Sequence, residues 1–157
     1  MNNLDFIDDI MKYIKESFSN DSDFSNVKIE KAYKPENQIK TPEIDIFLDN
    51  DIEDVISNSY DKENISIKVV TFYCYNKAME FNNSETKSDV VDSTMILSDR
   101  LKAILNKNLV AKNNKNIISL TRKNSIPPQN VRDGMVYVAI IRYEFKVLNE
   151  YAKIYNR

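Results

Sequence analysis

The segment ISIKVVTFYCY, residues 65–75, carries the clearest strand pattern of the sequence. In its first half, apolar Ile65, Ile67 and Val69 alternate with other side chains, as on a strand with one buried face. In its second half both faces are apolar, which is typical of a strand covered on both sides. We therefore expect residues 65–75 to form a central strand of a sheet. At the start of this strand, the face that carries Ile65, Ile67 and Val69 is expected to be buried.

Towards the N-terminus, the residue pattern predicts one helix and two strands. Residues 4–18 place apolar side chains at helical spacing, whereas residues 27–33 and 44–48 alternate between apolar and polar side chains. The acidic stretch 50–63 shows neither period throughout. A short helical turn around Ile52–Ile56 is compatible with it.

Towards the C-terminus, the polar residues 76–87 predict a loop, and residues 88–105 predict a long helix with one apolar stripe. Ile117–Thr121 is expected to be a short strand. Asn124–Gly134 contains two adjacent prolines and the only glycine, so we expect a long loop there.

Residues 135–148, MVYVAIIRYEFKVL, form the longest extended run. One face of the expected strand carries Tyr137, Ala139, Ile141, Tyr143 and Phe145. The alternation becomes one-sided near Arg142, so we expect the strand to leave the core there and to pair with a neighbouring molecule. Residues 149–157 form a C-terminal extension of a domain that spans residues 1–148.

The order α–β–β–β–α–β–β predicts an α+β fold. We expect a single domain in which two helices pack on a mixed, mostly antiparallel sheet of about five strands. A chain of 157 residues is long enough to bury a core. The sequence has no apolar run long enough to span a membrane and no signal-peptide pattern at its start, so neither is expected.

The composition argues against most enzymes. The sequence has no histidine, one cysteine (Cys74) and one glycine (Gly134). It therefore lacks the commonest general base, a set of zinc ligands and a glycine-rich phosphate loop. Cys74 lies in an apolar strand with no histidine to activate it, so we expect a buried structural thiol. No catalytic residue, cofactor or metal is expected.

Two acidic segments fail the tests for metal sites. A calcium loop that begins at Asp49 would need glycine at its sixth position and glutamate at its twelfth, but Asp54 and Tyr60 stand there. A restriction-type nuclease with Asp45 as its first acid would need an acid-x-Lys on the next strand. The segment Ser66-Ile67-Lys68 does not provide it.

Charge is unevenly divided along the chain. Residues 1–65 hold 16 acidic and 7 basic side chains, giving −9, and residues 66–157 hold 8 acidic and 15 basic, giving +7. Two explanations are open. The halves neutralise each other within one fold, or they form complementary faces that meet between neighbouring copies in a head-to-tail ring.

The order of elements resembles that of the phage tail-terminator (tail completion) proteins, the lambda gpU-like group. The similarity lies in the proline-led strand TPEIDIFL at residues 41–48, the central strand 65–75, and the last strand YVAIIRYE at residues 137–144, which closes on Tyr-Glu as in that family. It covers nearly the whole chain through pattern and order, without a diagnostic short motif. The residues beyond Glu144 depart from the family pattern and are expected to serve an extra contact, for example to a sheath or neck protein.

This resemblance implies a structural virion protein without enzymatic activity. Such proteins form a hexameric ring on the tail tube, end its polymerisation and join the tail to the neck or head. The implied partners are further copies of the chain, the tail tube protein, a neck or head-completion protein and, in a contractile particle or tailocin, the sheath. Genome DNA passes through the ring without specific binding, and no membrane takes part. The implied location is the host cytoplasm during assembly and the virion at maturity.

Contacts within such a particle are expected on loops and on the last strand. The candidate tube or neck contacts are Lys77, Glu80, Phe81, Lys87, Arg122, Lys123, Pro127, Pro128 and Arg132. The candidate ring contacts on the last strand are Tyr137, Ile141, Arg142, Tyr143 and Glu144.

Two other functions stay open. The sequence separates a tail terminator poorly from another head–tail connector, such as a neck stopper. A nucleic-acid-binding accessory domain would use Lys112, Lys115, Arg122 and Lys123 for contacts to phosphates. The sequence matches no known nucleic-acid-binding motif, and its pI of about 5.3 does not favour that function.

Overall fold

The computed structural model describes residues 3–31, 42–54, 65–77, 87–106, 117–132 and 136–148 of the chain. They form two helices and five strands in the predicted order. The elements are α1 (Asn3–Phe18), β1 (Lys28–Lys31), β2 (Glu43–Asp54), β3 (Ile65–Lys77), α2 (Lys87–Asn106), β4 (Ile117–Arg132) and β5 (Val136–Leu148).

The five strands form one open sheet in the order β1-β2-β3-β5-β4. β1 and β2 are parallel, and the other three neighbouring pairs are antiparallel. The predicted α+β fold with a mixed, mostly antiparallel sheet is therefore confirmed, and β3 is the central strand as expected. Because β5 lies between β3 and β4, the last strand of the sequence is an inner strand of the sheet.

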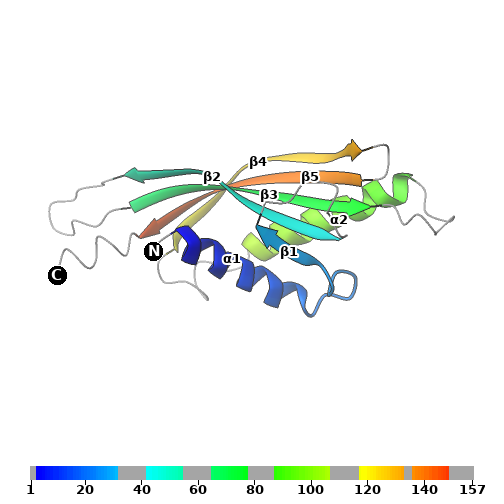
Figure 1. Cartoon of the computed structure of the whole chain (residues 1–157), viewed down its shortest axis with the longest axis horizontal. Coiled ribbons are helices and arrows are strands. Elements are labelled where there is room, and N and C mark those ends of the chain that lie inside the picture. Colours follow the sequence, from blue (N-terminus) through cyan, green and yellow to red (C-terminus); the bar gives the residue numbers. More distant parts are fainter. Residues whose placement is uncertain are drawn as a thin grey trace.

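Both helices pack on the same face of the sheet, and the main core lies between the two layers (Figure 1). The apolar stripe of each helix faces the strands, as the periodicity predicted. The helices contribute the fully buried side chains Phe6, Ile10, Ile14 and Phe18 from α1 and Leu97, Leu101 and Leu105 from α2. The sheet contributes, among others, Ile44, Ile46, Val70, Phe72, Ala139, Ile141, Tyr143 and Phe145.

Aromatic contacts fix the two layers against each other. Phe6 of α1 meets Phe145 of β5 edge to face, with ring centroids 5.2 Å apart. Phe72 and Tyr143 on the neighbouring strands β3 and β5 make a second such contact at 6.0 Å. Edge-to-face pairs add about 0.5–1.5 kcal/mol each beyond the burial of their apolar surface.

The turn after α1 is tied to α2 by charged groups. The Asp21 carboxylate accepts hydrogen bonds from the backbone amides of Asp23 and Phe24. Arg100 of α2 donates to Asp21 at 2.5 Å and forms an ion pair with Asp23 at 2.7 Å, and its guanidinium lies 5.2 Å from the Phe24 ring centroid. This group positions the start of β1 relative to α2.

The faces of β3 differ from the sequence prediction. Ser66 and Lys68 are buried on the helix-covered face, whereas Ile67 and Val69 are half-buried on the opposite face. The Lys68 ammonium lies 5.6 Å from the ring centroid of Phe6, so a cation–π contact compensates part of the cost of burying it. Since this compensation comes from α1, the periodicity of the strand alone gave the wrong face at this end.

Two strands are longer than predicted. β2 continues past Leu48 to Asp54, with a bulge between Leu48 and Asn50, so the helical turn expected at Ile52 is wrong. β4 is one strand from Ile117 to Arg132, so the loop expected over residues 124–134 is wrong up to Arg132. Prolines are compatible with β4 because it is the last strand of the sheet, and a register shift between Ile126 and Gln129 accommodates them.

Several predictions concern residues outside the described ranges. These are most of the 76–87 segment with Glu80 and Phe81, and the extension 149–157. Within the described ranges, neither helix combines the length and apolar character that crossing a membrane requires.

Candidate functional site

The face of the sheet opposite the two helices carries a second, smaller apolar cluster. Tyr73 and Tyr75 of β3 stack with ring centroids 6.3 Å apart and an interplanar angle of 19°. Val136 and Val138 of β5 are buried beside them, and Ile140 packs at the margin. Burial raises the pKa of the Tyr73 phenol, so it stays protonated and neutral at pH 7.

Polar groups on this same face link β2, β3 and β5. The Arg142 Nε donates to Asp49 Oδ2 at 3.0 Å and to Thr71 Oγ1 at 3.2 Å, and the Thr71 hydroxyl also donates to Asp49. Farther along, Lys123 of β4 forms an ion pair with Glu144 of β5 at 2.7 Å. These groups hold neighbouring strands together.

The two outer parts of the sheet carry opposite charge. β2 contains six acidic residues and no basic residue. β4 contains three basic residues and no acidic residue. The strand order places β2 beside the short edge strand β1 and places β4 at the other edge. The charge division seen along the sequence thus becomes a division between the two sides of the sheet.

The predicted loop contacts lie in regular structure where the structure describes them. Lys77 ends β3 and Lys87 begins α2. Arg122, Lys123, Pro127, Pro128 and Arg132 all belong to β4. Arg122 and Lys123 are exposed, and the structure brings them together on the basic edge. Their assignment to a loop is wrong, but whether they contact a partner stays a prediction.

The predicted ring contacts on β5 do not form an accessible surface. β5 pairs with β3 on one side and with β4 on the other, so it has no free edge for a neighbouring copy. Ile141 and Tyr143 are fully buried and Tyr137 is 9% exposed. Arg142 and Glu144 reach the surface, but each already pairs within the sheet. The expected pairing of this strand with another molecule is therefore wrong, because β4 folds back along it.

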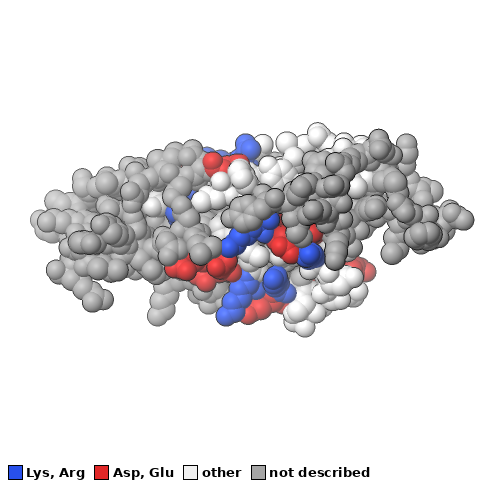
Figure 2. All heavy atoms as spheres, viewed as in Figure 1, with Lys and Arg blue, Asp and Glu red and all other residues white. Residues whose placement is uncertain are grey.

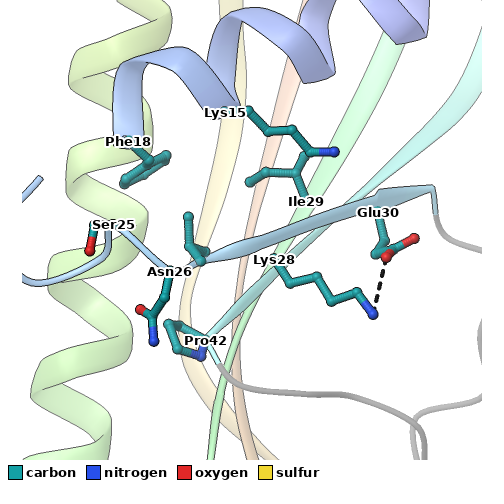
Figure 3. A pocket seen from close by; sticks show the side chains of 9 residues that line it. Lys15, Phe18, Ser25, Asn26, Lys28, Ile29, Glu30 and Pro42 are labelled. Carbon is teal, nitrogen blue, oxygen red and sulfur yellow. Dashed lines mark ion pairs between the residues drawn. The ribbon is translucent and has the colours of Figure 1, made fainter. Parts of the chain in front are cut away.

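A pocket of about 480 Å³ opens between the end of α1 and β1 (Figure 3). Phe18 and Ile29 form its apolar wall, and Lys15 and Lys28 stand at its rim. Lys28 pairs with Glu30 at 3.2 Å, as the dashed line shows. Ser25 and Asn26 complete the polar part of its lining.

Charged side chains on the face seen in Figure 2 are mixed in sign where they are described. Lys31 pairs with Asp8 at 3.1 Å. No group of three or more cysteine and carboxylate side chains is placed to hold a metal ion among the described residues. Cys74 is fully buried, and burial raises the pKa of its thiol far above the usual value, so it is an unreactive core residue.

The residues proposed for nucleic-acid contact are only partly placed. Lys112 and Lys115 lie outside the described ranges. Arg122 and Lys123 are neighbours in β4, and Lys123 is held by Glu144. Phosphate binding by this group stays a prediction.

No protein-family model and no curated protein matches the chain. Among solved structures, it is similar to a chain described as "Virion of native gene transfer agent (GTA) particle". The TM-score is 0.49 and the sequence identity 11%, over 89% of this chain and 95% of that chain. A TM-score of this size does not establish a shared fold, so the function proposed below rests on the residues of this chain.

Proposed function

We propose that the chain is a structural subunit of a phage or phage-like particle, and that it acts as a tail terminator. In this role, copies of the chain form a ring on the last ring of the tail tube and stop its growth. The ring then presents a surface to a neck or head-completion protein, and genome DNA passes through it. The resemblance of the chain to tail-terminator proteins in element order supports this assignment.

The observation that carries the proposal is the opposite charge of the two sides of the sheet. β2, with six acids of which Glu43 and Asp45 are buried, and β4, with three bases, lie on opposite sides of β3 and β5. A subunit with unlike, complementary edges favours head-to-tail contacts over two-fold contacts between identical patches. Head-to-tail contacts generate a ring when the rotation between copies closes, and a cap on a tube requires a closed ring.

The test is the effect of the protein on tube growth. Purified protein is added to polymerising tail tube protein from the same particle, and tube lengths are measured by negative-stain electron microscopy. We expect tubes to shorten as the ratio of added protein to tube protein rises. The variant Asp92→Lys/Asp99→Lys, which changes only the exposed surface of α2, should cap as well as the wild type.

Unchanged tube lengths at every ratio would remove the terminator function. If the protein then bound a portal or adaptor protein, the neck-stopper function would replace it. Retention on single-stranded or double-stranded DNA at low salt, without any effect on tubes, would instead favour the nucleic-acid-binding function.

A further inference from the structure

We propose that neighbouring copies join by strand pairing: residues Ile117–Asn124 of β4 in one copy lie antiparallel to residues Phe47–Asp54 of β2 in the next. The proposal deepens the function above, on which it rests, by naming the two surfaces that meet in the ring. The partner is therefore a second copy of this chain.

The first surface is the part of β2 that β1 leaves uncovered. β1 pairs with Glu43–Ile46 only, at the beginning of β2. From Phe47 to Asp54, no other described strand lies on the side of β2 away from β3. Figure 1 shows β2 running on beyond the short blue β1. Within the described part of the chain, the backbone groups on this side of β2 have no strand partner, and the proposal assigns them to the next copy.

The second surface is the outer side of β4, which is the last strand of the sheet. Its two halves differ in their capacity to pair. Pro127 and Pro128 lack backbone N–H groups, so the half that contains them is a poor partner for another strand. Ile117–Asn124 contains no proline and keeps its donors.

The register of the sheet places the two pairing segments at the same position along the strand direction. Following the paired residues across β5 and β3, Ile117 lies in one row with Glu53, and Asn124 lies in one row with Phe47. Copies in a ring are related by rotation alone, without translation along the axis. The segment of β4 that can pair therefore meets the segment of β2 that is free to pair.

The remaining rows match in the same way. Gln129, directly after the two prolines, shares a row with Glu43, and Ser125 shares a row with Ile46. These are the rows in which β1 already covers β2. The prolines of one copy thus lie where β1 of the next copy already covers β2. The joint therefore requires β4 to bend away from β2 of the next copy after Asn124, and the register shift between Ile126 and Gln129 lies in this part of the strand.

Strand direction and charge agree with this joint. β2 and β5 run in one direction, and β3 and β4 run in the other, so continuing the sheet brings β4 antiparallel to the next β2. The rows of Arg122 and Asn124 correspond to Leu48 and Phe47, next to Asp49. The present partners, Glu144 for Lys123 and Arg142 for Asp49, form ion pairs at the surface that are easily exchanged or shared.

The test uses two variants with reversed charges. One variant changes the β4 side of the joint, and the other changes the β2 side. Arg122→Glu/Lys123→Glu makes both edges of one copy acidic, and Asp51→Lys/Glu53→Lys brings the net charge of Phe47–Asp54 from −4 to zero. We expect each variant alone to self-associate about a hundredfold more weakly than the wild type, because the first variant sets like charges against each other and the second removes the attraction of β2 for β4. An equimolar mixture restores both kinds of joint and should give rings of alternating copies with an even subunit number, seen by native mass spectrometry at low salt.

A matched control separates the joint from general charge effects. The exposed substitutions Asp92→Lys and Asp99→Lys on α2, made together, change the net charge as much as Asp51→Lys/Glu53→Lys does, at positions outside both edge strands. The variant that carries both should assemble as the wild type does. Far-ultraviolet circular dichroism and thermal unfolding of each variant verify that it is folded, and restoration by mixing itself requires folded variants.

Three results would overturn the inference. These are a wild-type protein that stays monomeric at its highest soluble concentration, folded variants that assemble alone as the wild type does, and variants that fail to assemble when mixed. If tube growth is still blocked by the wild type in any of these cases, the terminator function stands and only the joint is wrong. If tube growth is unaffected while the mixture assembles, the joint stands and the terminator function is wrong.

Discussion

Asp21 is a single carboxylate on which the connection between α1, β1 and α2 depends. Its side chain is only 16% exposed. It accepts hydrogen bonds from two backbone amides and forms an ion pair with the Arg100 guanidinium. Burial acts to raise the pKa of Asp21, but the amides of Asp23 and Phe24 and the charge of Arg100 together outweigh it and hold the pKa below its usual value of 3.8. The folded protein therefore favours the ionised form.

We predict that Asp21→Asn lowers the free energy of unfolding by about 1–2 kcal/mol at pH 7, because a neutral amide oxygen accepts these hydrogen bonds more weakly and the ion pair with Arg100 is lost. A carboxyl with a depressed pKa stabilises fully above its unfolded pKa of 3.8 and loses this stabilisation as the pH falls through its lower folded pKa. The difference between variant and wild type should therefore shrink below about pH 4. Urea unfolding from pH 7 to pH 2.5 measures it, with exposed Asp8→Asn as the control; a difference independent of pH would contradict the account.

At the scale of elements, α2 is held by a narrow stripe of leucines. Leu97, Leu101 and Leu105 are at most 1% exposed and lie between α1 and the strands β3 and β5, whereas Ile96 of the same helix is 45% exposed. The two kinds of position differ in how much apolar surface a truncation removes from the core.

We predict that Leu101→Ala lowers the free energy of unfolding by about 2–5 kcal/mol, because it leaves a cavity in the core. Ile96→Ala should change it by less than about 0.5 kcal/mol. Thermal and urea unfolding of both variants provide the comparison. Similar losses at the two positions would mean that the exposed side of α2 is also packed in solution.

The sequence predicted the order and type of all seven elements, because helical and strand periods are local properties of the chain. It missed features that depend on distant neighbours. Lys68 is buried because Phe6 of α1 receives its ammonium group, and nothing within β3 reveals this. Pro127 and Pro128 indicated a loop, but an edge strand with register shifts accommodates them.

The sequence revealed the charge of the candidate contact surfaces, but it did not reveal which strands carry them. The sequence showed the acidic and basic halves, which supply the charged strands β2 and β4. It placed the ring contacts on β5, since the strand pattern of residues 135–148 is the longest. β4, expected to be short, runs along the whole of β5 and occupies its edge, so β5 cannot pair with a strand of another copy. Whether residues of β5 contact a partner in another way stays a prediction. The length of β4 follows from pairing between strands, which a single sequence does not display.

At the scale of the whole molecule, the two edges of the sheet differ, because one side is acidic and the other is basic. The fold itself does not require this separation of charge. Strands that each carried both acidic and basic residues would neutralise each other's charge equally well. The separation favours contact between copies that lie side by side, because the acidic edge of one copy attracts the basic edge of the next.

We predict that self-association weakens as sodium chloride is raised from about 0.05 M to about 0.5 M, because the Debye length falls from above 10 Å to a few ångströms. Sedimentation velocity at several protein concentrations measures the change. The control variant Asp92→Lys/Asp99→Lys should show the same salt dependence. Association that does not respond to salt would point to apolar contacts, with Phe47, which is 42% exposed, as the first residue to test.

The most direct test of the head-to-tail joint is a disulfide trap between the two edges. Asn50 and Thr121 share a row of the sheet, so Asn50→Cys/Thr121→Cys brings the two new thiols together only between copies. The native Cys74 is buried and does not interfere. After mild oxidation, we predict a ladder of linked oligomers on a non-reducing gel that ends at the closed ring, while each single variant gives at most dimers. A double variant that stays unlinked, or stops at dimers, under conditions in which the wild type self-associates would contradict the account.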